Sequence, residues 1–345
     1  MRHTRSTFLI LASAISLSAP TVFAQSAPAY HVVKKIAAGG EGGWDYLIAD
    51  TAAERLYVSR GTHVMVVDLK ADSVIGDIPN TAGVHGIAFA PSLNRGFTSN
   101  GRDTSVTIFD LKTLAPIGTV KVTGRNPDAI VFDPFSGRVF TFNGGGANTT
   151  AIDAATGTVA GTIELGGKPE FSVSDMKGTM YVNIEDKSEV VAFDPKALKV
   201  KARYPLAPCE EPSGMAMDRT NNRLFVVCSN KLMAVLDAAN GHVITTLPIG
   251  QGVDASGFDP STGFAFASNG EGTMTIVHED SPNKFSVVGN VPTQRGARTM
   301  ALDPKTHRIY MSTAQFGPPP APTPERPNPR PTVVPGSFTI LVLDR

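Results

Sequence analysis

One phrase recurs seven times along this chain, at intervals of 40 to 44 residues. A short apolar run ends in Asp or Pro, and a turn and three further apolar runs follow it. The clearest copies are PDAIVFDPFSGRVFTFNG (127–144), SGMAMDRTNNRLFVVCSN (213–230) and DASGFDPSTGFAFASNG (254–270). Repeats of this length with four short strands are typical of β-propeller blades. The sequence therefore predicts an all-β fold, a WD40-like seven-bladed β-propeller of four-stranded antiparallel blades.

Composition agrees with one large repeat domain and excludes some partners. The 33 Gly and 26 Pro suit the many turns of such a fold. Net charge is zero, 18% of the residues are charged and 7% are aromatic, so no basic surface points to nucleic acid. We expect a single propeller domain over residues 25–345, acting as a monomer.

The first 24 residues have the pattern of a secretory signal peptide. Arg2 and Arg5 precede an apolar run from Phe8 to Ala19, and Val22-Phe23-Ala24 resembles a cleavage site. An uncleaved membrane anchor is the alternative, but the run is shorter than the roughly 20 residues that a span needs. We expect residues 1–24 to be removed and the mature protein to be periplasmic or secreted, with no membrane span.

The two cysteines are predicted to form a disulfide. Cys209 lies in the loop that leads into the fifth blade, and Cys228 ends the second strand of that blade. Both positions fall on the same rim of the blade, and an exported protein meets oxidising conditions. A metal-binding or redox pair is the alternative, although C-x-x-C spacing is lacking.

The repeat also assigns roles to recurrent polar residues. The residues that close the first strand of each blade are Asp50, Ala90, Asp133, Asp175, Asp218, Asp259 and Asp303. Asp before a turn accepts backbone N–H bonds, so these aspartates are expected to be structural. Asparagines near the end of the second strand are expected to form turns and to tolerate positive φ: Asn100, Asn143, Asn183, Asn230 and Asn269.

The seventh blade lacks its outer strand, and the start of the mature chain supplies a candidate. YHVVKKI (30–36) resembles the outer strands SVIGDI (73–78) and HVITTL (242–247). We predict that residues 30–36 pair with 338–344, which closes the ring and removes an open sheet edge.

Residues 317–336, GPPPAPTPERPNPRPTVVPG, interrupt the seventh blade. A segment so rich in proline should be extended rather than part of a sheet. It is expected on the face where the loops lead into each blade, here called the upper face. It is either a surface loop or a lid over the channel mouth.

Five residues before each strand-closing position stands the residue that enters the central channel. These residues, here called the channel ring, are Asp45, His85, Asp128, Glu170, Ser213, Asp254 and Arg298. Their sequence neighbours include Trp44, Glu210, Glu211 and Arg295. Loops from every blade converge at a channel mouth, which makes it the expected place for a ligand.

The channel ring has two interpretations. In the first, the acids cap strand starts and pair with His85 and Arg298, so that the ring holds the blades together. In the second, the ring is a polar pocket. Carboxylates of Asp45, Asp128, Glu170 and Asp254 suit Ca²⁺ or Mg²⁺, and an added imidazole admits Zn²⁺. No cofactor is certain, and a divalent cation is the candidate.

Several segments resemble YVTN-type repeats, among them RLYVSRGTHVMVVDL, GRVFTFNGGGANTTAIDAATGTV and NRLFVVCSNKLMAVLDAANGHV. From about Tyr30 to Arg345 the chain resembles the YncE-like family of exported seven-bladed propellers. The resemblance implies a binding or accessory protein without a shared catalytic motif. The first hypothesis is therefore a binding or scaffold protein that takes a small molecule or a periplasmic protein at the polar channel mouth.

Two alternatives remain open. The second hypothesis is a divalent-metal-dependent hydrolase or lyase, lactonase-like, in which the four carboxylates hold the metal. His85 would be the general base, and Arg298 would stabilise an oxyanion. The third follows from the family resemblance, since related propellers occur as subunits of periplasmic redox systems. This chain has no C-x-x-C-H haem motif, so it would be an accessory subunit and not the redox centre.

Overall fold

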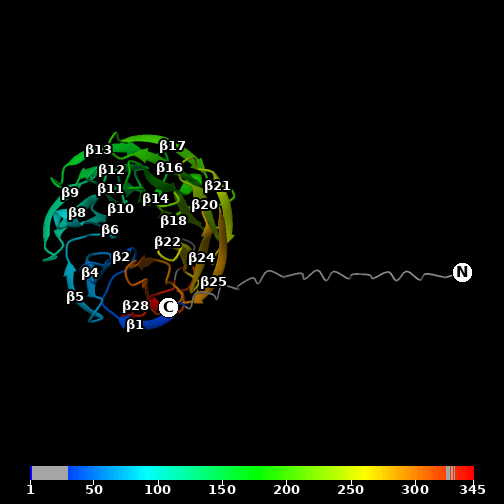
Figure 1. Ribbon diagram of the computed structural model, residues 1–345. Helices are drawn as coiled ribbons and strands as arrows, with labels where there is room; N and C mark the ends of the chain where they lie inside the picture. Colours follow the sequence, from blue (N-terminus) through cyan, green and yellow to red (C-terminus); the bar gives the residue numbers. More distant parts are fainter. Residues whose placement is uncertain (2–29, 324–326, 328, 330) are drawn as a thin grey trace.

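The computed structural model describes residue 1, residues 30–323, 327 and 329, and residues 331–345. Seven four-stranded antiparallel sheets stand in a ring, with the first strand of each blade nearest the axis (Figure 1). This confirms the predicted fold. The expected signal peptide lies, apart from Met1, outside the described residues. Among those that are described, no helix is both long and apolar enough to cross a membrane.

The strands follow the repeat blade by blade. Blade 1 contains β2 (Leu47–Asp50), β3 (Arg55–Ser59), β4 (Val64–Asp68) and β5 (Ser73–Ile78). Blade 2 contains β6 (Val84–Ala90), β7 (Arg95–Asn100), β8 (Ser105–Asp110) and β9 (Pro116–Lys121). Blade 3 contains β10 (Pro127–Asp133), β11 (Arg138–Asn143), β12 (Asn148–Asp153) and β13 (Val159–Glu164). Blade 4 contains β14 (Pro169–Ser174), β15 (Met180–Ile184), β16 (Glu189–Asp194) and β17 (Lys199–Pro205).

The last three blades complete the ring. Blade 5 contains β18 (Pro212–Asp218), β19 (Arg223–Cys228), β20 (Leu232–Asp237) and β21 (Val243–Pro248). Blade 6 contains β22 (Val253–Asp259), β23 (Phe264–Asn269), β24 (Thr273–Ser281) and β25 (Lys284–Pro292). Blade 7 contains β26 (Met300–Leu302), β27 (Ile309–Thr313), β28 (Thr339–Asp344) and β1 (His31–Ala37). Short 3₁₀ turns follow β6 and β15 at Pro91–Leu93 and Glu185–Lys187.

Blade 7 closes the ring as predicted. β1 pairs antiparallel with β28, from His31 opposite Asp344 to Ala37 opposite Thr339. Tyr30 extends the contact, because its hydroxyl donates to the carbonyl of His307 at 2.9 Å. β1 and the C-terminus lie side by side in Figure 1. The outer edge of β28 is therefore paired, which removes an exposed strand edge between the first and last blades.

The core lies between blades, because side chains of a strand alternate between its two faces. In β19, Leu224 and Val226 pack in a cluster with Tyr181 of blade 4. Their neighbours Phe225 and Val227 pack in a cluster with blade 6. The middle strands are thus buried on both faces, and their near-continuous apolar runs follow from this arrangement.

The aspartates that close the first strands act as predicted. Asp50 Oδ1, for example, accepts backbone N–H bonds from Ala52 and Ala53 at 3.1 and 3.0 Å. The other five accept at least one such bond from the turn that follows them: Asp133, Asp175, Asp218, Asp259 and Asp303. These side chains belong to the turns and not to a site.

Of the five asparagines, Asn230 lies in a turn as predicted, but none has a positive φ, and the other four lie in strands. Asn143 shows what they do instead. Its amide is buried and donates to Asn148 Oδ1 at 2.8 Å and to Thr150 Oγ1 at 3.0 Å. The amides of Asn100 and Asn269 make the same kind of bond to hydroxyls of the next strand. These side chains tie neighbouring strands together where the backbone ladder ends.

The predicted disulfide is present, and both cysteines are fully buried. Cys209 lies in the loop before β18, and Cys228 is the last residue of β19, with 5.7 Å between their Cα atoms. The bond therefore fixes the loop that leads into blade 5 against that blade.

The described C-terminal part of the proline-rich segment lies on the upper face, as expected; residues 324–326, 328 and 330 are outside the described residues. Pro331 and Val333 line the same hollow as Trp44 and Arg298. Its base departs from the prediction of no sheet, because Phe316 and Val333 form an antiparallel bridge. Trp44 packs against this base, with its ring centroid 6.3 Å from Phe316 and 5.3 Å from Phe338. The indole therefore packs against the base of the segment, and it also lines a hollow together with Asp45 and His85.

Candidate functional site

The repeat places the channel ring at the upper mouth of the axial channel. Five members are the second residue of the innermost strand of their blade: His85, Asp128, Glu170, Ser213 and Asp254. Asp45 and Arg298 stand two residues before β2 and β26. Because the strands of all seven blades start at the same height, these side chains converge on the axis.

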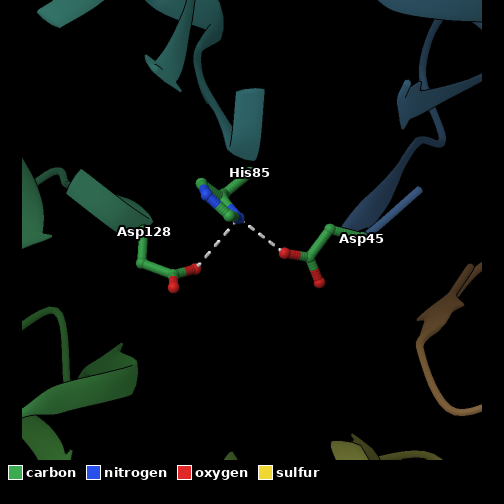
Figure 2. Close-up of side chains that lie close together, drawn as sticks. All are labelled: Asp45, His85 and Asp128. Atoms are coloured by element: carbon green, nitrogen blue, oxygen red, sulfur yellow. Dashed lines mark hydrogen bonds and ion pairs between the residues drawn. The ribbon is translucent and has the colours of Figure 1, made fainter. Parts of the chain in front are cut away.

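Three members from adjacent blades form one cluster (Figure 2). His85 Nδ1 lies 2.7 Å from Asp45 Oδ2 and 3.7 Å from Asp128 Oδ1, so the imidazole stands between two carboxylates. Each residue offers one ligand atom, and these three atoms lie within 4.8 Å of one another. The carboxylate side chains of Asp45 and Asp128 are 22% and 17% exposed. The cluster is therefore sheltered yet open to the channel.

The other two acids of the ring pair with cations. Asp254 Oδ2 lies 2.7 Å from Arg298 Nη1. Glu170 Oε1 lies 2.7 Å from Nζ of Lys168, which also contacts Glu185. Ser213 donates instead to the backbone carbonyl of Val253 at 3.4 Å. The predicted ligand set of four carboxylates is thus divided, with Asp45 and Asp128 on the imidazole and Asp254 and Glu170 on two cations.

Three acids of the ring, Asp128, Glu170 and Asp254, have raised pKa values. Burial raises the pKa of Asp128 to about 6, although the charge of His85 favours its ionised form. Burial likewise raises the pKa of Asp254 to about 7 against the effect of Arg298. Burial and the charge of Asp128 also raise the pKa of Glu170, with Lys168 opposing them. In each case burial is the largest cause, and the cationic partner offsets it only in part.

For His85 the combined effects favour the charged form instead. Burial disfavours the charged form of His85, but the hydrogen bond to Asp45 and the charges of Asp128 and Asp45 outweigh burial and raise its pKa. An added cation at this point would take the place of the proton on the ring and would offset the charge of both carboxylates.

Two aromatic residues that sequence reasoning missed close the channel beneath the ring. Tyr46 of blade 1 and Phe171 of blade 4 stack with centroids 4.9 Å apart and an interplanar angle of 28°. Burial raises the pKa of Tyr46 well above its usual value, and the charges of Asp128 and Glu170 add to the effect. The stacked pair separates the polar mouth from the rest of the channel. A signal was available, because the other blades have small residues at this position, Gly86, Ala129, Gly214, Ala255 and Thr299.

The remaining predicted neighbours lie away from the cluster. The carboxylate of Glu211 accepts a hydrogen bond from Ser229 at 2.8 Å, beside the disulfide loop, and Glu210 is exposed in the same loop. Arg295 is exposed and lines a hollow at the mouth together with Arg298. Lys168, which the ring positions did not include, supplies a charge to the site.

Comparison with known proteins supports the fold and leaves the activity open. No family model matches the chain, and no curated protein matches it. A solved structure described as "Crystal Structure of Mitotic Checkpoint Complex" contains a similar chain, with a TM-score of 0.73 and 10% sequence identity. The match covers 99% of this chain and 99% of that chain. Because the identity is so low, the likeness shows a shared fold alone.

Proposed function

We propose that this chain is an exported, YncE-like propeller that binds a small ligand through a positively charged group at the upper mouth of its channel. The observation that carries the proposal is the cluster of Asp45, His85 and Asp128, in which two carboxylates face one imidazole. A cation at this place would satisfy both carboxylates, whose charges one partly exposed imidazole balances incompletely.

The charge of the whole mouth supports the same ligand class. The pKa of Asp128 is about 6 and that of Asp254 about 7, even though each has a cationic partner. A bound cation would therefore drive protons off these acids, and its affinity should rise between pH 5 and pH 8. Both a metal ion and an organic ammonium group have this chemistry, and direct titration separates them.

A second candidate is a divalent-metal-dependent hydrolase or lyase, favoured by the three ligand atoms that lie within 4.8 Å of one another. Asp45, His85 and Asp128 would hold the metal, which would supply a Lewis acid for a carbonyl substrate. In this arrangement His85 is a ligand and is not free to act as general base. Arg298 remains available at the mouth, since its side chain is 47% exposed.

The test is calorimetric titration of metal-free protein at pH 6 and pH 8 with ZnCl₂, CaCl₂ and putrescine. We expect saturable binding of at least one cation, stronger at pH 8, and a loss of about tenfold or more in Asp128→Asn. Asp77→Asn is the matched control, because Asp77 is 52% exposed on an outer strand and pairs with His63, which is not a member of the channel ring. Binding that Asp128→Asn leaves unchanged would refute the proposal. Metal-dependent turnover of an ester or lactone, lost in Asp128→Asn, would favour the second candidate.

A further inference from the structure

Beneath the stacked Tyr46 and Phe171, the axial channel changes character. A cavity of about 410 Å³ lies there, lined by the innermost strands of blades 1, 2, 3, 4, 6 and 7. Its lining is mainly aliphatic and aromatic and includes Ile48, Ile87, Phe89, Val131, Phe132 and Met300. Among the described residues that line it, Tyr46 alone has an ionisable side chain. This half of the channel is thus the chemical opposite of the mouth above.

Two serines interrupt the apolar lining. Ser172 of β14 and Ser256 of β22 both line the cavity, and neither hydroxyl has a hydrogen-bond partner among the described residues. Ser172 is only 4% exposed. A buried hydroxyl without a partner destabilises a fold, so its presence in an otherwise apolar wall calls for an explanation. Both hydroxyl oxygens are buried, and a ligand with a hydrogen-bonding group would supply the missing partner once the serine side chains turn toward the cavity.

The size of the cavity fits the same explanation. Small-molecule sites are mostly apolar hollows of about 300–1,000 Å³ with a few convergent polar groups. Phe89 and Phe132 each stand one residue before the end of their strand, at the face opposite the channel ring. These rings are only partly buried, which is typical of the rim of a site and not of a sealed core.

We propose that this cavity binds an uncharged, largely apolar molecule of about the size of a bicyclic aromatic, which bonds through a hydroxyl or carbonyl to Ser172 and Ser256. The site is separate from the cation site, because the stacked Tyr46 and Phe171 stand between them. Burial of apolar area would provide most of the affinity, and the hydroxyls would select for a polar group.

The experiment uses three probes: 1-naphthol, naphthalene and the 1-naphthoate anion. We expect saturable binding of 1-naphthol by calorimetry, and binding of the anion at least tenfold weaker because no cation lines the cavity. The double variant Ser172→Ala/Ser256→Ala should bind 1-naphthol about five- to tenfold more weakly and should bind naphthalene as before. Ser256→Leu fills the space and should lose both neutral probes, while Asp77→Asn should bind like the unchanged protein.

A measurement on the unchanged protein keeps the proposal testable if Ser256→Leu does not fold. With methionine methyl groups labelled for NMR, 1-naphthol should give intermolecular NOEs to Met300, which lines the cavity. Met233, fully buried in blade 5, should give none. The proposal is overturned if 1-naphthol does not saturate, if Met300 shows no NOE, or if the anion binds as tightly as the alcohol.

Discussion

Replacing Asp128 with Asn should make the protein more stable at pH 8. The carboxyl ionises near pH 3.8 in an unfolded chain and near pH 6 in the fold. This difference corresponds to about 3 kcal/mol of unfavourable ionisation. The side chain is 17% exposed, and the variant loses the contact with His85 at 3.7 Å. We therefore expect a net gain of about 1–2 kcal/mol, or a Tm rise of about 2–3 °C for a domain of this size.

The sign of the pH dependence follows from proton binding. Between about pH 4 and pH 6 the folded chain keeps a proton on Asp128 that the unfolded chain has lost. Rising pH therefore lowers stability through this interval, and the cost is complete above about pH 6. The Asn variant never ionises at this position, so its advantage should be large at pH 8 and nearly absent at pH 4.

Thermal unfolding at pH 4 and pH 8, followed by circular dichroism, measures both values. Asp303→Asn is a control of opposite sign. Burial of Asp303 is outweighed by hydrogen bonds from Thr306 and Thr51, which lower its pKa. That variant should be destabilised at pH 8 and less so at low pH. A lower Tm for Asp128→Asn at pH 8, or an equal shift at both pH values, would refute the reasoning. The gain would mark Asp128 as a residue kept for binding and not for stability.

Two further changes test the architecture. Arg60 is buried, stacks on Phe338 at 3.7 Å and donates to the carbonyls of residues 39–42. A lysine cannot make all of these contacts, so Arg60→Lys should lower the free energy of unfolding in urea by about 3 kcal/mol. An unchanged free energy of unfolding would contradict this. Removing the disulfide as Cys209→Ala/Cys228→Ala should cost about 3 kcal/mol, because it frees a loop of 19 residues; equal urea midpoints for both proteins would argue against it.

Much of the fold could be predicted because a repeat fixes local structure many times over. The turn after Asp50 and the pairing of residues 30–36 with 338–344 both follow from comparing one blade with another. Asn143 shows the limit of that comparison. Its preference for turns is a local property, and the fold instead buries its amide against Asn148 and Thr150. Local propensity could not foresee these partners, because they become available only once the strands have paired.

The candidate site was likewise predicted from the sequence only in part. The repeat register identified Asp45, His85 and Asp128 as facing one channel, and the structure brings them together. Lys168 and Arg60 were missed because neither stands at a ring position. Their importance depends on where the neighbouring loops lie, and one-dimensional spacing does not report that.

The sequence by itself determined the seven blades, the closure by the first strand, the disulfide and the ring of ionisable residues, because each depends on a period or a spacing along the chain. Only the tertiary structure decided which ring residues pair. It also decided that Tyr46 and Phe171, three blades apart, stack across the axis and divide the channel into a charged mouth and an apolar cavity. The physical reason is that the repeat register indicates which side chains face the channel but not which of them meet across it, because the geometry of the closed ring alone sets the distances between them.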